Sequence, residues 1–251
     1  MANGFEYRTV SIASDGESKC GDALVEITMR WPLSHESPSI YPQLHNLPLL
    51  NLLVGKDDIT ADKDFKHIFK CQRNAWMRDK GVLVNGHLIT VPVLTVHLKS
   101  NDNSSSHVRS LMNPNDKQDV VLGYSLLKAI WELPPLPSGS HNSAARDALR
   151  LYGQFAYFLI SPYICVDLDL DEQLINLSAA AHLLLFLYTD NQAQTKFIPS
   201  QSYLDIMIMI KNVYFCLAKS KVDNPKGNFF IIQLDDDIGC PSCKPTKRRC
   251  V

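Results

Sequence analysis

The stretch from Thr60 to Asn74 reads TADKDFKHIFKCQRN, and the rest of the chain is arranged around it. An acidic cluster leads into a run in which His67, Lys70 and Arg73 recur at the spacing of one helix face. Asp64 stands at the start of that run, where the free N–H groups and the dipole of a helix favour a carboxylate. The pattern predicts a helix with a cationic stripe. A capped helix with a solvated face gives the same pattern, so the stretch alone leaves both interpretations open.

Composition sets broad limits. The 251 residues are 45% apolar, which suffices for one large or two small domains with a substantial core. A net charge of -1 gives no overall basic field, so a nucleic-acid partner would need local basic patches. The odd count of seven cysteines favours free thiols. With no secretory signal and no apolar run near the ~20 residues of a membrane span, we expect an intracellular protein without a membrane partner.

Two strands are predicted before this stretch. Residues 7–13, YRTVSIA, alternate in polarity and are typical of a strand, and Asp15 follows in a turn-like group. A carboxylate just past a strand end is held rigidly yet stays open to a metal ion, although an ordinary Asp-Gly turn explains it equally well. Residues 22–31 predict a second strand, and residues 49–54 a short buried one.

Downstream, the pattern becomes mainly helical. Asn85-Gly86 between two apolar triplets is the strongest hairpin signal in the chain. The run SNDNSSS, residues 100–106, has no core-forming residue and predicts a polar linker. His182, on an apolar helical stretch, is interpreted as a core histidine. Further predicted elements are helices near 114–131, 144–160, 172–188 and 200–219, and a buried strand at 228–234.

These elements predict an α/β protein with four parts. Residues 1–100 would form a part with a mixed sheet and helices, 101–110 a polar linker, and 111–234 a mainly helical subdomain that ends in a strand. Residues 235–251 form a divergent tail with a basic run, KPTKRR, which fits a nuclear-import or phosphate-binding patch or simply a solvated end. A tetrahedral zinc site needs a second pair of ligands, so we do not expect zinc at Cys240, Cys243 and Cys250.

Three segments in this order, DFKHIFKCQRN, GVLVNGHLIT and NPNDKQDVVLGYSLL, resemble the catalytic region of P-element-type transposases. A closer resemblance, from about Ser11 to Leu234, is to transposase-like proteins of fungal genomes. The resemblance implies an RNase H-like fold of the DDE class for the N-terminal part. It also implies DNA as the partner, the nucleus as the location, and two Mg²⁺ or Mn²⁺ ions held by two aspartates and a glutamate.

On this resemblance, Asp15 is the first metal-binding catalytic aspartate and Asp64 the second, since Asp64 precedes His67 by three residues and Lys70 by six. His67, Lys70 and Arg73 become candidate DNA contacts. The expected glutamate falls near Gly239 or Cys240, where the sequence has none, and we do not expect residues 235–237, DDD, to replace it. The resemblance therefore implies a C-terminally truncated or divergent transposase fragment that lacks activity. The alternative is a non-catalytic scaffold protein whose helices 114–219 expose an apolar patch.

Overall fold

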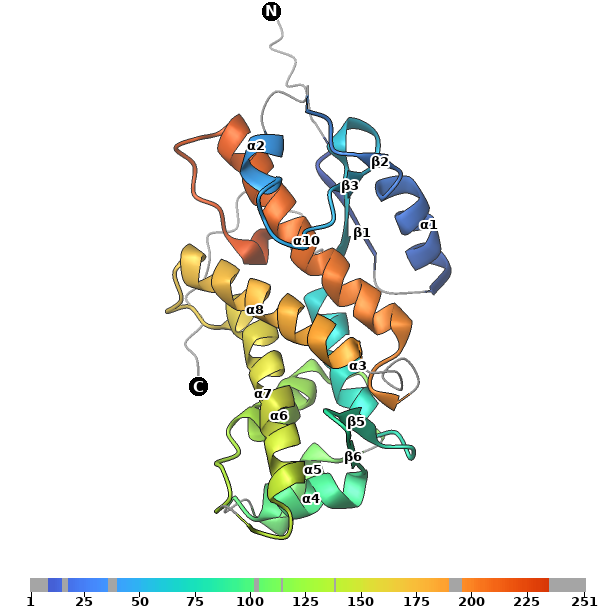
Figure 1. Ribbon diagram of the computed structural model, residues 1–251, viewed down its shortest axis with the longest axis vertical. Coiled ribbons are helices and arrows are strands. Elements are labelled where there is room, and N and C mark those ends of the chain that lie inside the picture. Colours follow the sequence, from blue (N-terminus) through green and yellow to red (C-terminus); the bar gives the residue numbers. More distant parts are fainter. Residues whose placement is uncertain are drawn as a thin grey trace, which may run out of the picture. The chain divides into compact units, whose positions relative to one another are not determined.

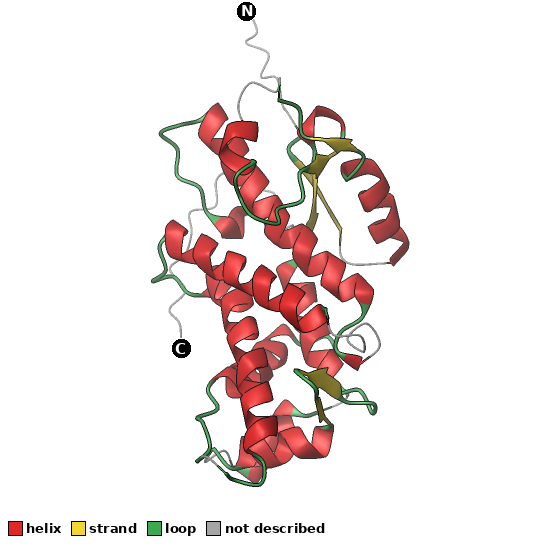
Figure 2. Cartoon of the chain, in the orientation of Figure 1, coloured by secondary structure: helices red, strands yellow, loops and turns green. Residues whose placement is uncertain are grey.

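The computed structural model describes residues 9–14, 18–35, 40–101, 104–113, 115–137, 139–189 and 196–234. Helices dominate it, and its strands are short (Figure 2). The chain divides into two compact units: among the described residues, unit 1 comprises residues 9–64 and 207–234, and unit 2 comprises residues 65–206. Unit 1 is therefore discontinuous in sequence, and unit 2 is inserted into it.

This division differs from the one predicted around a linker at 101–110. Helix α5 (Ser105–Leu111) occupies most of that segment and buries Val108 and Leu111. Ser104 caps the helix, because its hydroxyl accepts a hydrogen bond from His107 N at 3.1 Å. A serine-rich run can thus begin a helix, and two apolar residues further on are enough to anchor it.

Unit 1 combines short strands with helices. Its elements are β1 (Ser11–Ser14), α1 (Ser18–Thr28), β2 (Trp31–Pro32), α2 (Tyr41–Leu44), β3 (Leu53–Val54), η1 (Lys56–Asp58), β4 (Thr60–Lys63), most of α10 (Ser200–Asp223) and η2 (Ile231–Leu234). Strands β1 and β4 pair in parallel, and β2 and β3 pair antiparallel. A core cluster of Leu33, Ile40, Leu44, Val54, Phe215 and Ala218 joins α10 to the loops around α2 and β3.

Two predicted strands of unit 1 are wrong. Residues 22–31 lie mostly in α1, where Gly21, Leu24 and Thr28 are buried at helical spacing. The β-branched residues of the segment favoured a strand. Its buried residues, however, recur every three to four positions, which is the spacing of a helix. Residues 228–234 contain the 3₁₀-helix η2 in place of a buried strand; Phe230 is exposed, and local hydrogen bonds replace those of a sheet.

Unit 2 is helical apart from one hairpin. It contains α3 (Phe65–Trp76), β5 (Val82–Val84), β6 (His87–Ile89), α4 (Val91–Lys99), α5, α6 (Val120–Trp131), α7 (Ser143–Ile164), α8 (Leu170–Tyr188) and the first residues of α10. The predicted hairpin is confirmed: Asn85 and Gly86 have positive φ angles of 46° and 78°, as its two-residue turn requires. The predicted helices near α7, α8 and α10 are also confirmed.

Details at the helix ends correct the sequence-based boundaries. Asp169 caps α8 in a reciprocal pair with Glu172, whereas α6 begins at Val120 behind Asp119, later than predicted.

The prediction of a core histidine at position 182 is wrong, because His182 is exposed and its Nδ1 lies 2.8 Å from the Ser178 carbonyl oxygen. That side of α8 faces solvent even though its sequence is apolar.

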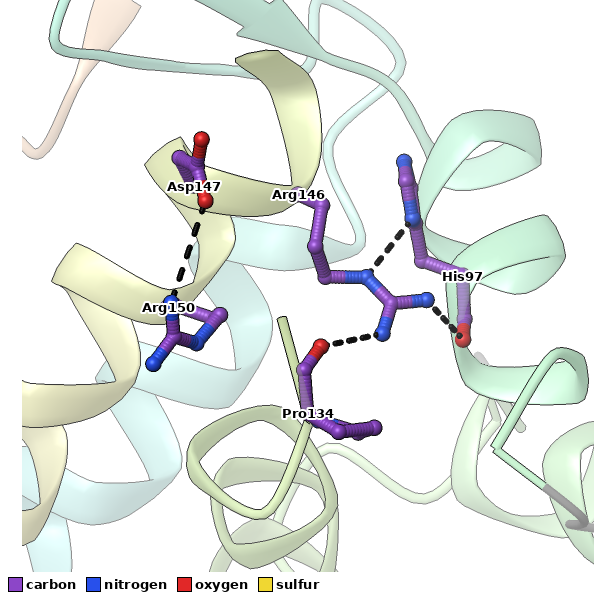
Figure 3. A network of polar contacts seen from close by, with 5 residues as sticks. All are labelled: His97, Pro134, Arg146, Asp147 and Arg150. Atoms are coloured by element: carbon purple, nitrogen blue, oxygen red, sulfur yellow. Dashed lines mark hydrogen bonds and ion pairs between the residues drawn. The ribbon is translucent and has the colours of Figure 1, made fainter. Parts of the chain in front are cut away.

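A buried arginine joins three segments of unit 2 (Figure 3). Arg146, on α7, donates from Nε to His97 Nδ1 at 3.0 Å and from its guanidinium to the carbonyl oxygens of His97 and Pro134. Burial, followed by the positive charge of Arg146, lowers the pKa of His97. The imidazole therefore stays neutral and accepts the Arg146 hydrogen bond.

Among the described helices, none combines the length and apolar composition that crossing a bilayer requires. Cys71, Cys165 and Cys216 are reduced thiols outside any disulfide, in agreement with the expectation for these three cysteines. The remaining cysteines provide no test of that expectation.

Candidate functional site

The two candidate metal-binding aspartates follow neighbouring parallel strands. In the register of β1 and β4, Ser14 stands opposite Lys63. Asp64 is the next residue after Lys63 and is half-buried. Asp15 is the next residue after Ser14 in the sequence and lies outside the described residues. A cross-strand hydrogen bond from Lys63 Nζ to Ser14 Oγ, 2.9 Å long, ties the two strand ends together.

Helix α10 lies beside β1 in Figure 1, and polar contacts that sequence reasoning missed anchor the β1–β4 pair to it. Thr60 donates from its hydroxyl to Asn212 Oδ1 at 2.6 Å, and Lys219 donates from Nζ to the Val10 carbonyl oxygen at 2.7 Å. Asp62 is also buried, on the same strand as Thr60. The signal in the sequence was the spacing of Asn212, Cys216 and Lys219 on one face of α10, opposite polar residues that alternate along β4.

A second buried lysine, Lys211, lies on the same helix. Its ammonium hydrogen-bonds the Leu53 carbonyl oxygen and lies 5.2 Å from the centroid of the Phe215 ring. Burial, with a further contribution from the charge of Lys219, lowers the pKa of Lys211 to about 8. Both buried lysines of α10, Lys211 and Lys219, thus donate hydrogen bonds to backbone carbonyl oxygens.

The predicted cationic stripe lies on α3, which belongs to unit 2. Lys70 donates to Gln118 Oε1 at 3.3 Å in an exposed contact. His67 is half-buried, and its Nε2 lies 3.2 Å from the Cys71 sulfur. Burial raises the pKa of Cys71, and the negative charge of Asp205 raises it further, so this thiol is protonated at neutral pH.

Arg73 occupies a different environment from Lys70, although both lie on α3. It is 1% exposed, and its guanidinium donates to the carbonyl oxygens of Leu111 (3.3 Å), Asn113 (2.6 Å) and Asp116 (2.8 Å). Five donors in a planar fork suit an arginine to this task. The geometry gives Arg73 the role of fixing the segment after α5 against α3.

Asp64, directly after β4, has the carboxylate chemistry that hard divalent cations take as a ligand. Carboxylate oxygens are the ligands that Mg²⁺ and Mn²⁺ prefer, and two such groups follow adjacent strand ends. Within the described part of the chain, no cluster of three or more histidine, cysteine, aspartate or glutamate residues could hold a metal. Asp15, Cys240, Cys243, Cys250 and the position expected for the third carboxylate all fall outside that part.

No protein-family model matches the sequence. No curated protein matches it either. Among solved structures, the Drosophila P element transposase strand transfer complex matches with a TM-score of 0.54 at 18% identity over 92% of this chain.

The fold is therefore of mixed α/β type and resembles that of a transposase chain. The chain spans about half the length of the transposase chain it matches, 53%. At this level of identity the likeness shows the fold. The likeness to the P element transposase of Drosophila agrees with the family resemblance found in the sequence.

Proposed function

We propose that this chain is a transposase-derived DNA-binding protein with an RNase H-like unit 1. Its Asp15 and Asp64 supply two of the three carboxylates of a two-metal centre of the DDE class. The proposal is supported by the transposase-like fold and by one observation above all: Ser14 and Lys63 are register partners in a parallel pair, and each is followed directly by one of the two aspartates.

The geometry of parallel strands explains why this observation matters. Neighbouring strands lie about 4.8 Å apart, and successive Cα atoms are about 3.8 Å apart along each chain, so residues that follow a register pair start from the same edge of the sheet. Two divalent ions about 4 Å apart would activate a water or hydroxyl nucleophile and stabilise the leaving oxygen of a phosphodiester. Within the chain itself, Asp64 would bind the cation, and Lys63 would hold the strand end that carries it.

Unit 2 would contribute DNA contacts separately. Lys70 and His67 lie on α3 with polar atoms near the surface, which suits contacts to phosphate oxygens. Arg73 would act indirectly, since its guanidinium is bonded to three backbone carbonyl groups. Such a protein would work in the nucleus.

The proposed function includes loss of DNA cleavage. The resemblance places the third carboxylate near Gly239 or Cys240, where the sequence reads DDDIGC. A metal pair without this ligand lacks part of its coordination and charge neutralisation. Removing one group that stabilises a transition state electrostatically lowers the rate by about 10² to 10³. We therefore expect DNA binding without efficient strand cleavage.

The test combines DNA binding with nicking of labelled DNA in Mg²⁺ or Mn²⁺, for the wild type and Asp64→Ala. We expect both proteins to bind DNA and neither to nick it above background. Nicking by the wild type that Asp64→Ala abolishes would overturn the loss of activity and establish an enzyme. Failure of the folded wild type to bind DNA would overturn the proposed function.

A non-catalytic scaffold protein is the second candidate, and one observation favours it. Ile175 and Phe186, on the solvent side of α8, are 67% and 58% exposed and lie with His182 at spacings of one helix face. If this face binds a second copy of the chain, Ile175→Ser/Phe186→Ser will abolish self-association in sedimentation velocity. A wild type that stays monomeric at every concentration tested would exclude self-association through α8.

A further inference from the structure

Helices α4 and α5 border a groove with a volume of about 610 Å³ in unit 2. Each helix supplies one cation to its lining, Lys99 from α4 and Arg109 from α5. The rest of the lining combines hydroxyl residues and the Asn113 amide with the apolar residues Val108 and Met112, and none of the described lining residues is a carboxylate. Asp102, in the connection between α4 and α5, lies outside the described residues. Among the described residues, the lining therefore presents two cations without a neutralising group. The Thr95 and Ser110 hydroxyls already donate to the Val91 and His107 carbonyl oxygens of their own helices.

Both cations are available to a ligand. Lys99 and Arg109 are exposed, and within the described residues neither one forms an ion pair or side-chain hydrogen bond. Other cations of unit 2 are paired, such as Lys128 with Glu132 and Arg150 with Asp147. Two unpaired cations lining one groove create a local positive potential even in a chain of nearly zero net charge.

The Asn113 side chain adds a neutral donor. Its Oδ1 accepts a hydrogen bond from the Asn115 N–H at 3.1 Å, which leaves the two amide hydrogens on Nδ2 to donate elsewhere. Arg73 holds the Asn113 backbone in place through the 2.6 Å bond to its carbonyl oxygen. The groove is thus anchored at one end by a buried guanidinium on α3.

The segment after α5 connects this groove to α3. From Asn113 at the groove, it leads to Lys117, whose carbonyl oxygen accepts from Asn74 Nδ2 at 3.2 Å, and to Gln118, which accepts from Lys70 Nζ at 3.3 Å. The segment therefore connects the groove, with Lys99 and Arg109, to the exposed contact between Lys70 and Gln118. A polymer with regularly spaced negative charges suits such a surface better than a single small anion, which would fill only part of the groove.

The geometry points to the α4/α5 groove as a binding site for the phosphate backbone of a DNA strand, with Lys99 and Arg109 as the residues that bind phosphate. Arg binds phosphate oxygens through its planar fork, and Lys acts as a point charge. Because neither side chain reads a base edge, the site contributes affinity without sequence preference. This inference rests on the proposed DNA binding and adds to it a surface outside α3.

The test is fluorescence anisotropy with a short labelled DNA duplex at salt concentrations from about 50 to 200 mM. The variant is Lys99→Gln/Arg109→Gln, and the matched control is Lys128→Gln/Arg150→Gln, which removes the same charge from α6 and α7 of the same unit. Circular dichroism checks that each protein is folded. Since Lys99 and Arg109 make no side-chain bond within the described residues, we expect the groove variant to fold normally.

We expect the groove variant to reduce the slope of log affinity against log salt by about 2, because each of the two removed cations neutralises one phosphate group, and the control to leave the slope unchanged. Equal slopes for groove variant and control, with a wild type that binds DNA, would overturn this inference and leave the proposed function intact. A wild type that does not bind DNA would overturn both. NMR can test a small anion separately. If pyrophosphate shifts the backbone amide signals of the groove residues in a protein that does not bind DNA, the assignment of this site to DNA is overturned.

Discussion

Lys63 donates a hydrogen bond from Nζ to the hydroxyl oxygen of Ser14, 2.9 Å away, across the parallel pair β1–β4. Each of these residues directly precedes one of the two candidate metal-binding aspartates. The bond therefore fixes the spacing of the two strand ends where a metal site would have to form. Its energetic contribution can be measured without a metal.

A double-mutant cycle on Lys63 and Ser14 measures this bond. A hydrogen bond with a charged partner contributes about 1.5 to 3 kcal/mol, so we expect Lys63→Met and Ser14→Ala to show a coupling energy of at least about 1 kcal/mol. Urea unfolding of the four proteins, followed by hydrogen exchange in β1 and β4, provides the measurement. Additive effects of the two substitutions would show that the bond does not stabilise the strand ends.

Gly153 is a test of helix packing in unit 2. A Cβ atom at Gly153 would lie 2.7 Å from the Cα atom of Trp131, so α6 and α7 would have to separate. We expect Gly153→Ala to lower the free energy of unfolding by about 1 to 3 kcal/mol. Gly123→Ala is the control, since its nearest neighbouring atom is at 3.4 Å and helix propensity favours alanine. Equal stabilities of the two variants would contradict the close approach of α6 and α7.

His97 predicts a specific pH dependence. Burial lowers its pKa in the folded state, so below the unfolded value of about 6.5 the unfolded chain binds the proton more readily. The contribution of His97 to stability is therefore complete above that pH and is lost as the pH falls towards the folded pKa. His97→Gln keeps an acceptor for Arg146 but does not titrate. We expect thermal melts to show a smaller loss of stability between about pH 7 and 5 for this variant; parallel losses would contradict the buried neutral imidazole.

Lys211 predicts a dependence of stability on pH in the alkaline range. Its folded pKa of about 8 lies below the unfolded value of about 10.4, so above pH 8 the unfolded state binds more protons and stability rises with pH. Cys216, whose pKa burial raises to about 11, acts in the opposite direction above its own unfolded value. The difference between wild type and Lys211→Met cancels the Cys216 contribution. We expect that difference to grow in favour of the wild type from about pH 8 to 10, and a constant difference would show that Lys211 is solvated.

Local patterns in the sequence predicted the hairpin and the long helices. Asn85-Gly86 determines its turn through positive φ angles. The α8 helix was predicted from residue 172, and its observed start at Leu170 behind the Asp169 cap lies two residues earlier. Such features depend on a few neighbouring residues, so a single sequence contains them. The helix α1 was missed because its β-branched residues have strand propensity, whereas burial of Leu24 and Thr28 depends on the rest of unit 1.

The discontinuous unit 1 could not be predicted from local patterns. It depends on hydrogen bonds between Thr60 and Asn212 and between Val10 and Lys219, which are separated by 152 and 209 positions. The same holds for Arg73: helical spacing placed it on a stripe with Lys70, but its burial arises from carbonyl groups about 40 residues away. Helical spacing predicted which residues share one face of α3, and tertiary packing determines which cations on that face reach solvent.

Binding of Mn²⁺ to the full chain, measured by isothermal titration calorimetry, tests the central claim most directly. The proteins are the wild type, Asp64→Asn, and Asp79→Asn as a control at an exposed aspartate in unit 2. If Asp64 is a metal ligand, the wild type and Asp79→Asn will bind Mn²⁺ alike, and Asp64→Asn will lose that binding while remaining folded. Equal Mn²⁺ binding by all three proteins, or none by any, would contradict the assignment of a metal centre to the ends of β1 and β4.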